Sequence, residues 1–181
     1  MKENRITQFK WFWGWQDEKQ EAWLEEMSRN GLHLVDMKAF GRYVFEVDPA
    51  KRYIYRMDYD RTSKSDSDYF NLIKEAGWER VIQVLGWQYW RLDASEGKNA
   101  EIFTDNNSKI KKYQRFLTSL IVPTPAPMFI VLALFNRFPG RYPQWVVILT
   151  ISLYAAWFSF LAVNIIKVLQ RINDLKHMKA L

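Results

Sequence analysis

The side chains of this sequence that are best suited to hold another molecule are aromatic, and they recur at strand spacing. They are Trp11, Trp13, Trp15, Tyr53, Tyr55, Tyr59, Trp87, Tyr89 and Trp90. Aromatic faces attract flat groups and cations, so one interpretation is a cleft for a small amphipathic ligand. Its candidate residues are Trp11, Trp13, Tyr55, Trp87, Tyr89 and Trp90. The other interpretation is that the rings fill a core between sheet and helices, because aromatic side chains suit a half-buried sheet.

Polar side chains occupy the alternate positions of the same segments: Lys10, Glu46, Arg56, Asp58 and Gln88. Arg56 is expected to pair with Asp58 or Glu46. Arg56 and Asp58 also join the candidate ligand site, where they would bind an acidic group or an acidic partner surface. The alternative is a solvated sheet face with ordinary cross-strand pairs.

The residue types of catalytic and metal sites are not grouped at a usable spacing. His33 and Asp36 are three residues apart, so their side chains would point to opposite faces of a strand, and His177 lies among basic residues. The sequence has no cysteine, no glycine-rich phosphate loop and no nucleophile–base–acid set. The carboxylates Glu18, Glu21, Glu25 and Glu26 fit the solvated face of a helix. We therefore expect a non-enzymatic protein without a metal or cofactor site.

The elements that must position these side chains form a β-α-β-β pattern that occurs twice. The first copy has an alternating strand at residues 6–15, a helix that starts with a capping box at Asp17 and Gln20 and ends at Gly31, and strands at 32–40 and 43–47. The second copy has a strand at residues 52–60, a helix that Asp66 or Ser67 caps and Gly77 ends, and strands at 78–85 and 87–92.

A shift of 46 residues superposes the two copies, so we predict an internal duplication. The shift places Lys10 on Arg56, Trp23 on Tyr69, Gly31 on Gly77 and Tyr43 on Tyr89. The expected fold of residues 1–108 is α+β, with one antiparallel sheet and two helices on one of its faces. Residues 101–105 are expected to add a short edge strand, and a further helix is expected to begin at Asn107 or Ser108.

The aromatic pattern resembles that of a bacterial family, the domain of unknown function 2812. The segments that carry this resemblance are Phe9-Lys10-Trp11-Phe12, Trp23-Leu24-Glu25-Glu26-Met27, Gly31-Leu32-His33-Leu34, Tyr53-Ile54-Tyr55-Arg56-Met57-Asp58-Tyr59, Ala76-Gly77-Trp78-Glu79, Trp87-Gln88-Tyr89-Trp90 and Glu101-Ile102-Phe103-Thr104-Asp105. The resemblance implies C-terminal membrane spans and a gene beside a transcriptional repressor of the PadR type, hence a regulatory setting. It implies no catalytic activity.

Two long apolar runs without charged residues, 117–135 and 145–166, occupy the second part of the chain. A bilayer core about 30 Å thick needs about 20 apolar residues of helix. Both runs are therefore expected to cross a membrane as a helical hairpin over residues 117–166. Pro123, Pro125 and Pro127 each remove a backbone donor, so the first span is expected to have a kinked or unwound entry, or to act as a hinge.

Basic residues set the expected orientation of this hairpin. They lie in a juxtamembrane helix at residues 109–116 (Lys109, Lys111, Lys112 and Arg115) and in an amphipathic tail at 167–181 (Lys167, Arg171, Lys176 and Lys179). The loop holds only Arg137 and Arg141, so both termini are expected to be cytoplasmic. Residues 1–108 contain 16 Lys and Arg against 19 Asp and Glu. The basic balance therefore belongs to the membrane region, and direct binding of nucleic acid is not expected.

The function predicted from the sequence is that of a membrane-anchored regulatory or binding protein. Its cytosolic domain would bind a small amphipathic ligand or a cytosolic protein, for which the resemblance suggests a PadR-type regulator. The alternative is an accessory membrane protein of stress response or transport. In that case the hairpin is the active part and pairs with a second copy of the chain, because its small and polar positions suit helix pairing.

Overall fold

The computed structural model describes residues 4–61, 68–94, 101–103, 105–122, 125–137, 140 and 142–177. The chain divides into two compact units, Met1–Ser108 and Lys109–Leu181.

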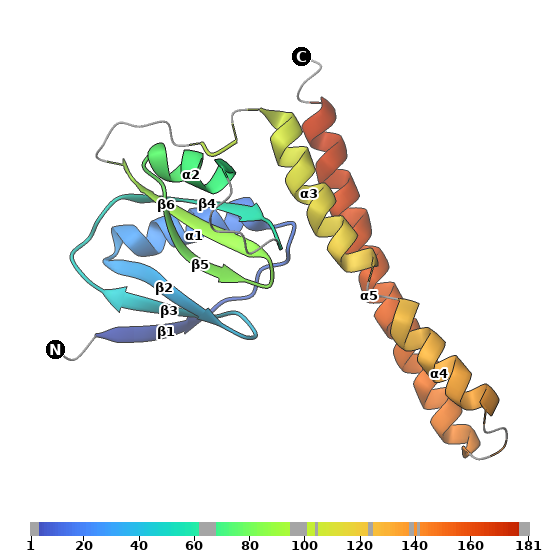
Figure 1. Cartoon of the computed structure of the whole chain (residues 1–181). Helices are drawn as coiled ribbons and strands as arrows, with labels where there is room; N and C mark the ends of the chain where they lie inside the picture. Colours follow the sequence, from blue (N-terminus) through green and yellow to red (C-terminus); the bar gives the residue numbers. More distant parts are fainter. Residues whose placement is uncertain are drawn as a thin grey trace. The chain divides into compact units, whose positions relative to one another are not determined.

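The first unit is an α+β domain, as predicted, but it holds two three-stranded antiparallel sheets instead of one continuous sheet (Figure 1). Its first half consists of β1 (Arg5–Phe9), α1 (Asp17–Arg29), β2 (Leu32–Lys38) and β3 (Arg42–Val47). Its second half consists of β4 (Tyr53–Tyr59), α2 (Asp68–Glu75), β5 (Glu79–Val84) and β6 (Trp87–Asp93). The sheet orders are β1-β3-β2 and β4-β6-β5. In both halves the third strand therefore lies between the first and the second.

The predicted shift of 46 residues holds for the helix ends and the second strands. The register of β2 shifts between Leu34 and Asp36, and that of β5 shifts between Arg80 and Ile82. Gly31 and Gly77 end the two helices with positive φ. A β-bulge and a left-handed helix end are specific backbone features, so their recurrence at one spacing relates the two halves residue by residue.

The first strands follow a different shift. The N–H of Lys10 donates to the carbonyl of Gly41 at 2.9 Å, and the N–H of Asp60 donates to that of Gly86 at 2.8 Å. These two bonds are equivalent, so Lys10 corresponds to Asp60. The predicted equivalence of Lys10 and Arg56 is therefore wrong. The cause is that the segment between the first strand and its helix, and the hairpin between the second and third strands, differ in length between the halves.

Side chains of α1 cover the free edge of β4, which explains why the two sheets do not join there. The N–H groups of Tyr53, Tyr55 and Met57 donate to Ser28 Oγ (3.3 Å), Glu25 Oε1 (3.4 Å) and Glu21 Oε1 (2.8 Å). Positions 21, 25 and 28 form one stripe of a helix, and alternate residues of a strand present their N–H groups on the same edge. The prediction that these carboxylates are solvated is wrong for Glu21, which is buried.

Each half has a core beneath its helix. Trp23 of α1 packs edge-on against Tyr43 and Phe45 of β3, with ring centroids 4.8 and 5.7 Å apart. In the second half, α2 and the sheet form a cluster of buried residues: Phe70, Ile73, Trp78, Trp90 and Leu92.

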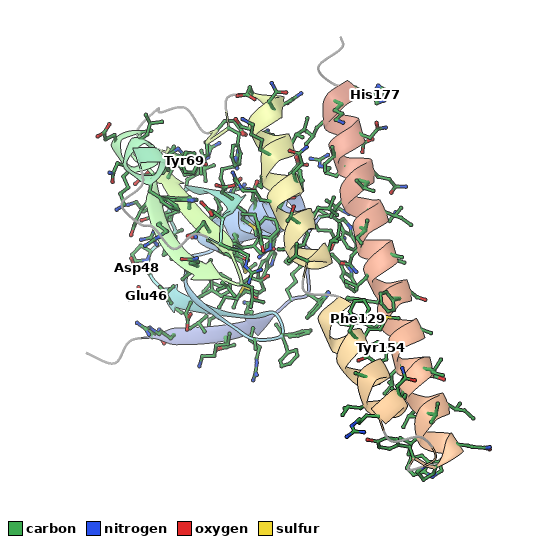
Figure 2. The ribbon with its side chains drawn as sticks, turned by 45° about the vertical axis from the view of Figure 1, so that its right-hand side comes forward. Glu46, Asp48, Tyr69, Phe129, Tyr154 and His177 are labelled. Carbon is green, nitrogen blue, oxygen red and sulfur yellow. The ribbon has the colours of Figure 1, made fainter. Side chains whose placement is uncertain are left out.

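In the part of the second unit that the structure describes, the regular elements are helices: α3 (Asn106–Ile121), which begins at the end of the first unit, α4 (Pro125–Arg137) and α5 (Gln144–His177). Asp105 caps α3, because its carboxylate accepts the N–H of Ser108 at 2.8 Å. Residues 101–103 do not form a strand, so the predicted edge strand at 101–105 is wrong. Both α3 and α4 run beside α5 (Figures 1 and 2).

Among the described residues, only α5 is long and apolar enough to cross a membrane. The predicted first span is divided, since α3 ends at Ile121 and α4 begins at Pro125. The 13 residues of α4 would extend about 20 Å, less than the bilayer core of about 30 Å. Pro125 accounts for a new helix start at this point, because its ring obstructs the preceding helical turn and its fixed φ suits the first helical position. The two-span hairpin is therefore not shown.

The predicted amphipathic tail continues α5 as far as His177. Its buried positions recur every three or four residues: Leu161, Asn164, Val168, Ile172 and Leu175. On α3, Tyr113 and Phe116 are buried, and Arg171 Nε donates to Tyr113 Oη at 3.4 Å. The stripe therefore faces α3 at this level.

Candidate functional site

A pocket of about 190 Å³ lies between the two halves of the first unit. Both halves line it, through the segment before α1, the start of α1, and the two β-hairpins. The lining residues are Trp11, Phe12, Trp13, Gly14, Gln20, Met37, Phe40, Gly41, Tyr43, Met57, Val84, Leu85, Trp87 and Tyr89. Half of these side chains are aromatic, and no charged residue is among them.

Gln20 of α1 joins the two halves at this pocket. Its side-chain Nε2 donates to Tyr43 Oη and to Tyr89 Oη, both at 2.8 Å. Each hydroxyl keeps its own proton. That of Tyr89 is directed at Met37 Sδ, 3.5 Å away. Tyr43 therefore has a proton to donate to a molecule in the pocket.

Burial keeps both hydroxyls neutral. It raises the pKa of Tyr43 well above the ordinary value for tyrosine, and the neighbouring Tyr89 raises it further. Burial also raises the pKa of Tyr89, although the hydrogen bond from Gln20 opposes this. At neutral pH the pocket therefore offers a hydroxyl donor and no charge.

Alkaline pH is expected to unfold the first unit cooperatively. Above the ordinary tyrosine pKa of about 10, the unfolded chain releases protons that folded Tyr43 and Tyr89 retain. The stabilisation is complete below that pH. It then falls by about 1.4 kcal/mol per pH unit for each tyrosine as pH rises toward their folded pKa values. Tyrosinate absorbance should therefore rise together with the loss of circular dichroism. The stability of the Tyr43→Phe/Tyr89→Phe double variant should depend less steeply on pH. Ionisation of Tyr43 and Tyr89 in a protein that keeps its native circular dichroism would show that burial does not hold them neutral.

The segment before α1 forms one wall of the pocket. The rings of Trp11 and Trp13 meet edge to face at 5.7 Å, and Trp13 stacks on Trp15 at 5.3 Å. The side chain of Gln16 accepts the N–H of Trp13 at 3.1 Å. The predicted strand at 6–15 is thus wrong beyond Phe9, because this turn folds the three tryptophans out of the sheet. The predicted capping box is also wrong, since Gln16 is the N-cap and makes no side-chain cap bond.

Two hairpin tips form the rim of the pocket. Phe40 and Leu85 have φ angles of 62° and 51°, and each precedes a glycine of positive φ, Gly41 or Gly86. Asparagine is the usual residue at the first of two such positions, and a bulky residue there costs about 1–3 kcal/mol. A Cβ on Gly41 would lie 2.6 Å from the carbonyl oxygen of Lys10. Glycine is therefore required at that position, whereas phenylalanine at position 40 is an unfavourable choice for the backbone.

The structure divides the aromatic residues predicted for a ligand site into two groups. Trp11, Trp13, Trp87 and Tyr89 line the pocket. Trp90 lies on the other face of β6, as strand alternation requires, and stacks on Phe70 at 5.7 Å. Tyr55 is buried outside the pocket lining.

The two charged candidates also lie outside the pocket lining. Arg56 Nη1 lies 2.9 Å from Glu25 Oε1, and Arg56 Nη2 lies 3.0 Å from Glu101 Oε1. The expected pairing of Arg56 with Asp58 or Glu46 is therefore wrong. Asp58 is fully buried and accepts the hydroxyl of Tyr69 at 3.1 Å.

Several pocket residues were not predicted from the sequence: Gln20, Met37, Phe40, Tyr43, Met57 and Leu85. The Phe-Gly and Leu-Gly dipeptides at the two predicted hairpin turns were an available signal, because apolar residues are unusual there. His33 lies elsewhere, with Nε2 3.0 Å from the carbonyl oxygen of Pro49. Within the described residues, no group of three His, Cys, Asp or Glu side chains is placed to hold a metal ion.

Comparison with known proteins gives one match. A family described as "Protein of unknown function (DUF2812)" matches residues 16–124, which include lining residues from both halves but exclude β1 and the pocket wall formed by the segment before α1. No curated protein and no solved structure matches the chain.

Proposed function

We propose that this chain, which belongs to the DUF2812 family, is a membrane-anchored, non-enzymatic binding protein. Its first unit would hold a small amphipathic ligand. The observation that carries this proposal is the uncharged aromatic pocket shared by the two halves. A ligand there would contact both hairpins and α1 at once. Its binding would therefore favour one arrangement of the two sheets, which suits a regulatory protein.

The dimensions and chemistry of the pocket favour a flat ligand of one or two rings. A cavity of about 150 Å³ is enough to hold benzene, and this pocket is somewhat larger, at about 190 Å³. A cation is less well suited, because Lys10 Nζ already lies 5.5 Å from the ring centroid of the lining residue Phe12. The preferred ligand is thus uncharged, with an acceptor for the Tyr43 hydroxyl.

The anchoring part of the proposal rests on α5. This helix has 34 residues, and its apolar side chains are largely exposed: for example, Ile148, Ile151 and Trp157. A helix that exposes such side chains along its length is suited to a lipid environment. We further propose that α3 and the end of α5, which carry the basic residues, lie on the cytoplasmic side of the membrane.

Titration of the full-length protein in lipid nanodiscs tests the pocket. 2-Naphthol is expected to quench tryptophan fluorescence saturably, because Trp11, Trp13 and Trp87 line the pocket. Tyr43→Phe should weaken this binding about 3- to 10-fold, the loss expected for one hydrogen bond. Naphthalene, which lacks the hydroxyl, should bind the wild type and Tyr43→Phe equally well.

Tyr55→Phe is the matched control, because Tyr55 is as buried as Tyr43 but lies outside the pocket lining. Equal effects of the two substitutions, or unsaturable quenching, would refute the ligand site. A response to a purified PadR-type regulator, with none to the naphthyl compounds, would instead indicate a domain that recruits a protein.

A further inference from the structure

We propose that the two hairpin tips dock the first unit onto an anionic membrane surface, so that the pocket opens toward the lipid. This inference rests on the proposed membrane anchoring and concerns a different part of the molecule, the rim of the pocket. An amphipathic ligand would then enter the pocket from the lipid surface.

The apolar side chains at the tips are among the most exposed in the first unit. Phe40 is 75% exposed and Leu85 is 91% exposed, and Trp11 beside them is 51% exposed. All three line the pocket, so they lie at one end of the domain. An aromatic and aliphatic group of this kind is suited to the boundary between lipid headgroups and acyl chains.

Basic side chains surround these tips. Lys38 and Arg42 flank Phe40 in the first hairpin, and both are exposed. Lys10 is bonded through its backbone N–H to Gly41. In the second hairpin, the side chain of Arg61 lies against Gly86, with Cγ 2.9 Å from the position of an added Cβ.

The charge balance at the tips favours lipid over a neutral protein surface. Four exposed cations, Lys10, Lys38, Arg42 and Arg61, stand beside one exposed acid, Asp36, and the half-buried Asp60. Basic residues that flank exposed apolar side chains add electrostatic attraction to anionic headgroups. The chain also carries a helix able to cross a membrane, which would keep the first unit near such a surface and raise its effective concentration there.

The backbone at the tips favours the same interpretation. The two halves differ in sequence at the tip, yet both place a bulky apolar residue at positive φ before a glycine. Asparagine would relieve this strain, so the apolar residues are unfavourable for the backbone, and contact with lipid would account for them. Strain of this kind is commonly retained at binding surfaces.

Single-cysteine labelling of the full-length protein in nanodiscs tests the proposal, because the chain has no native cysteine. An environment-sensitive fluorophore would be attached to Leu85→Cys, to Asp48→Cys or to Ser159→Cys. Asp48 is exposed and follows β3 at the end opposite the hairpin tip (Figure 2), about 20 Å along the strand. Ser159 lies in α5 and reports on the anchor itself.

In nanodiscs of phosphatidylcholine with phosphatidylglycerol, nitroxide-bearing lipid should quench the probe at position 85 at least twofold more than the probe at position 48. Phe40→Asn should reduce the quenching at position 85 at least twofold without loss of thermal stability. Leu72→Asn is the matched control, because Leu72 is also an exposed apolar residue, 66% exposed on α2; it should leave the quenching unchanged. High salt should weaken the docking.

Equal quenching at positions 85 and 48, with strong quenching at position 159, would overturn the docking and leave the anchor intact. Weak quenching at position 159 would contradict the anchoring itself. A change in the fluorescence of the probe at position 85 that depends on protein concentration, and not on anionic lipid, would overturn the proposal. It would instead indicate contact between two copies of the chain.

Discussion

Replacing Trp90 with alanine is expected to lower the free energy of unfolding of the first unit by about 3–5 kcal/mol. Trp90 is fully buried and is one of the two tryptophans in the cluster with Phe70, Ile73, Trp78 and Leu92. A domain of this size is stable by about 5–15 kcal/mol in total, so the variant would be near the limit of folding. Hydrogen exchange of the β4 and β6 amides in the full-length protein should accelerate by about two to four orders of magnitude.

Two substitutions separate this effect from a general sensitivity to the loss of tryptophan. Trp90→Phe keeps a ring in the stack, and it removes an indole N–H that has no hydrogen-bond partner. Its cost should therefore be well below that of Trp90→Ala, because the smaller ring leaves only a small cavity. Trp11→Ala, at a half-exposed position, should cost about 1 kcal/mol or less. If Trp90→Ala were no worse than Trp11→Ala, the core of the second half would not be packed as described.

The periodicity of the sequence predicted the type and order of the elements well, and their junctions poorly. Alternating apolar residues and the glycines at positions 31 and 77 place α1, β2 and β3, and again α2, β5 and β6, close to their positions in the structure. The run of tryptophans at 11, 13 and 15 has the same spacing as a strand, but it forms a turn. A period of two residues shows that side chains alternate, and the hydrogen bonds of Gln16 and Gly41 decide where the strand ends.

The sheet arrangement could not be read from the duplication. Two β-α-β-β units can form one sheet or two, and the choice depends on what satisfies the outer edge of β4. Here Glu21, Glu25 and Ser28 accept its N–H groups. In the sequence these three residues have the spacing of an ordinary polar helix face, which is why the carboxylates were expected to be solvated.

The candidate site was predicted in part for a related reason. Four of the six aromatic candidates line the pocket, because the strand pattern correctly identified large rings on β6 and near β1. Composition alone could not separate Trp87 from Trp90, which lie on opposite faces of one strand, until the face carrying α2 was known. The contribution of Gln20 could not be predicted either, because it depends on a tertiary contact with Tyr89, which is 69 residues away in the sequence.

The membrane region illustrates the limit of apolar composition as a signal. Residues 117–135 are as apolar as a spanning helix requires, yet α3 ends at Ile121 and α4 begins only at Pro125. Hydropathy measures the preference of side chains for lipid, whereas a span also needs an unbroken backbone ladder. Pro125, at the first position of α4, was visible in the sequence, and here it outweighs the composition.

Replacing Arg56 with methionine is expected to lower the free energy of unfolding by about 3 kcal/mol. The guanidinium lies between Glu25, at 2.9 Å, and Glu101, at 3.0 Å, with Glu21 at 3.9 Å. Burial alone would lower the pKa of Arg56, and these carboxylates outweigh the effect and raise it. Loss of the cation would remove its positive charge from beside the buried Glu21 and the half-buried Glu25. Removal of one member of a buried pair costs about 3–5 kcal/mol, and the partial exposure of this group places it at the lower end.

The reason to expect more than a lost ion pair is that the same carboxylates hold the edge of β4. Glu25 Oε1 accepts both the N–H of Tyr55 and the Arg56 guanidinium. In Arg56→Met, amide exchange at Tyr55 and Met57 should therefore accelerate about a hundredfold. Lys51→Met is the matched control, because Lys51 pairs with Asp93 at 2.8 Å on the surface, where a salt bridge contributes little to stability. Equal effects of the two variants would show that α1 holds β4 through its neutral contacts alone, and that the cation at position 56 is not needed to keep the two sheets apart.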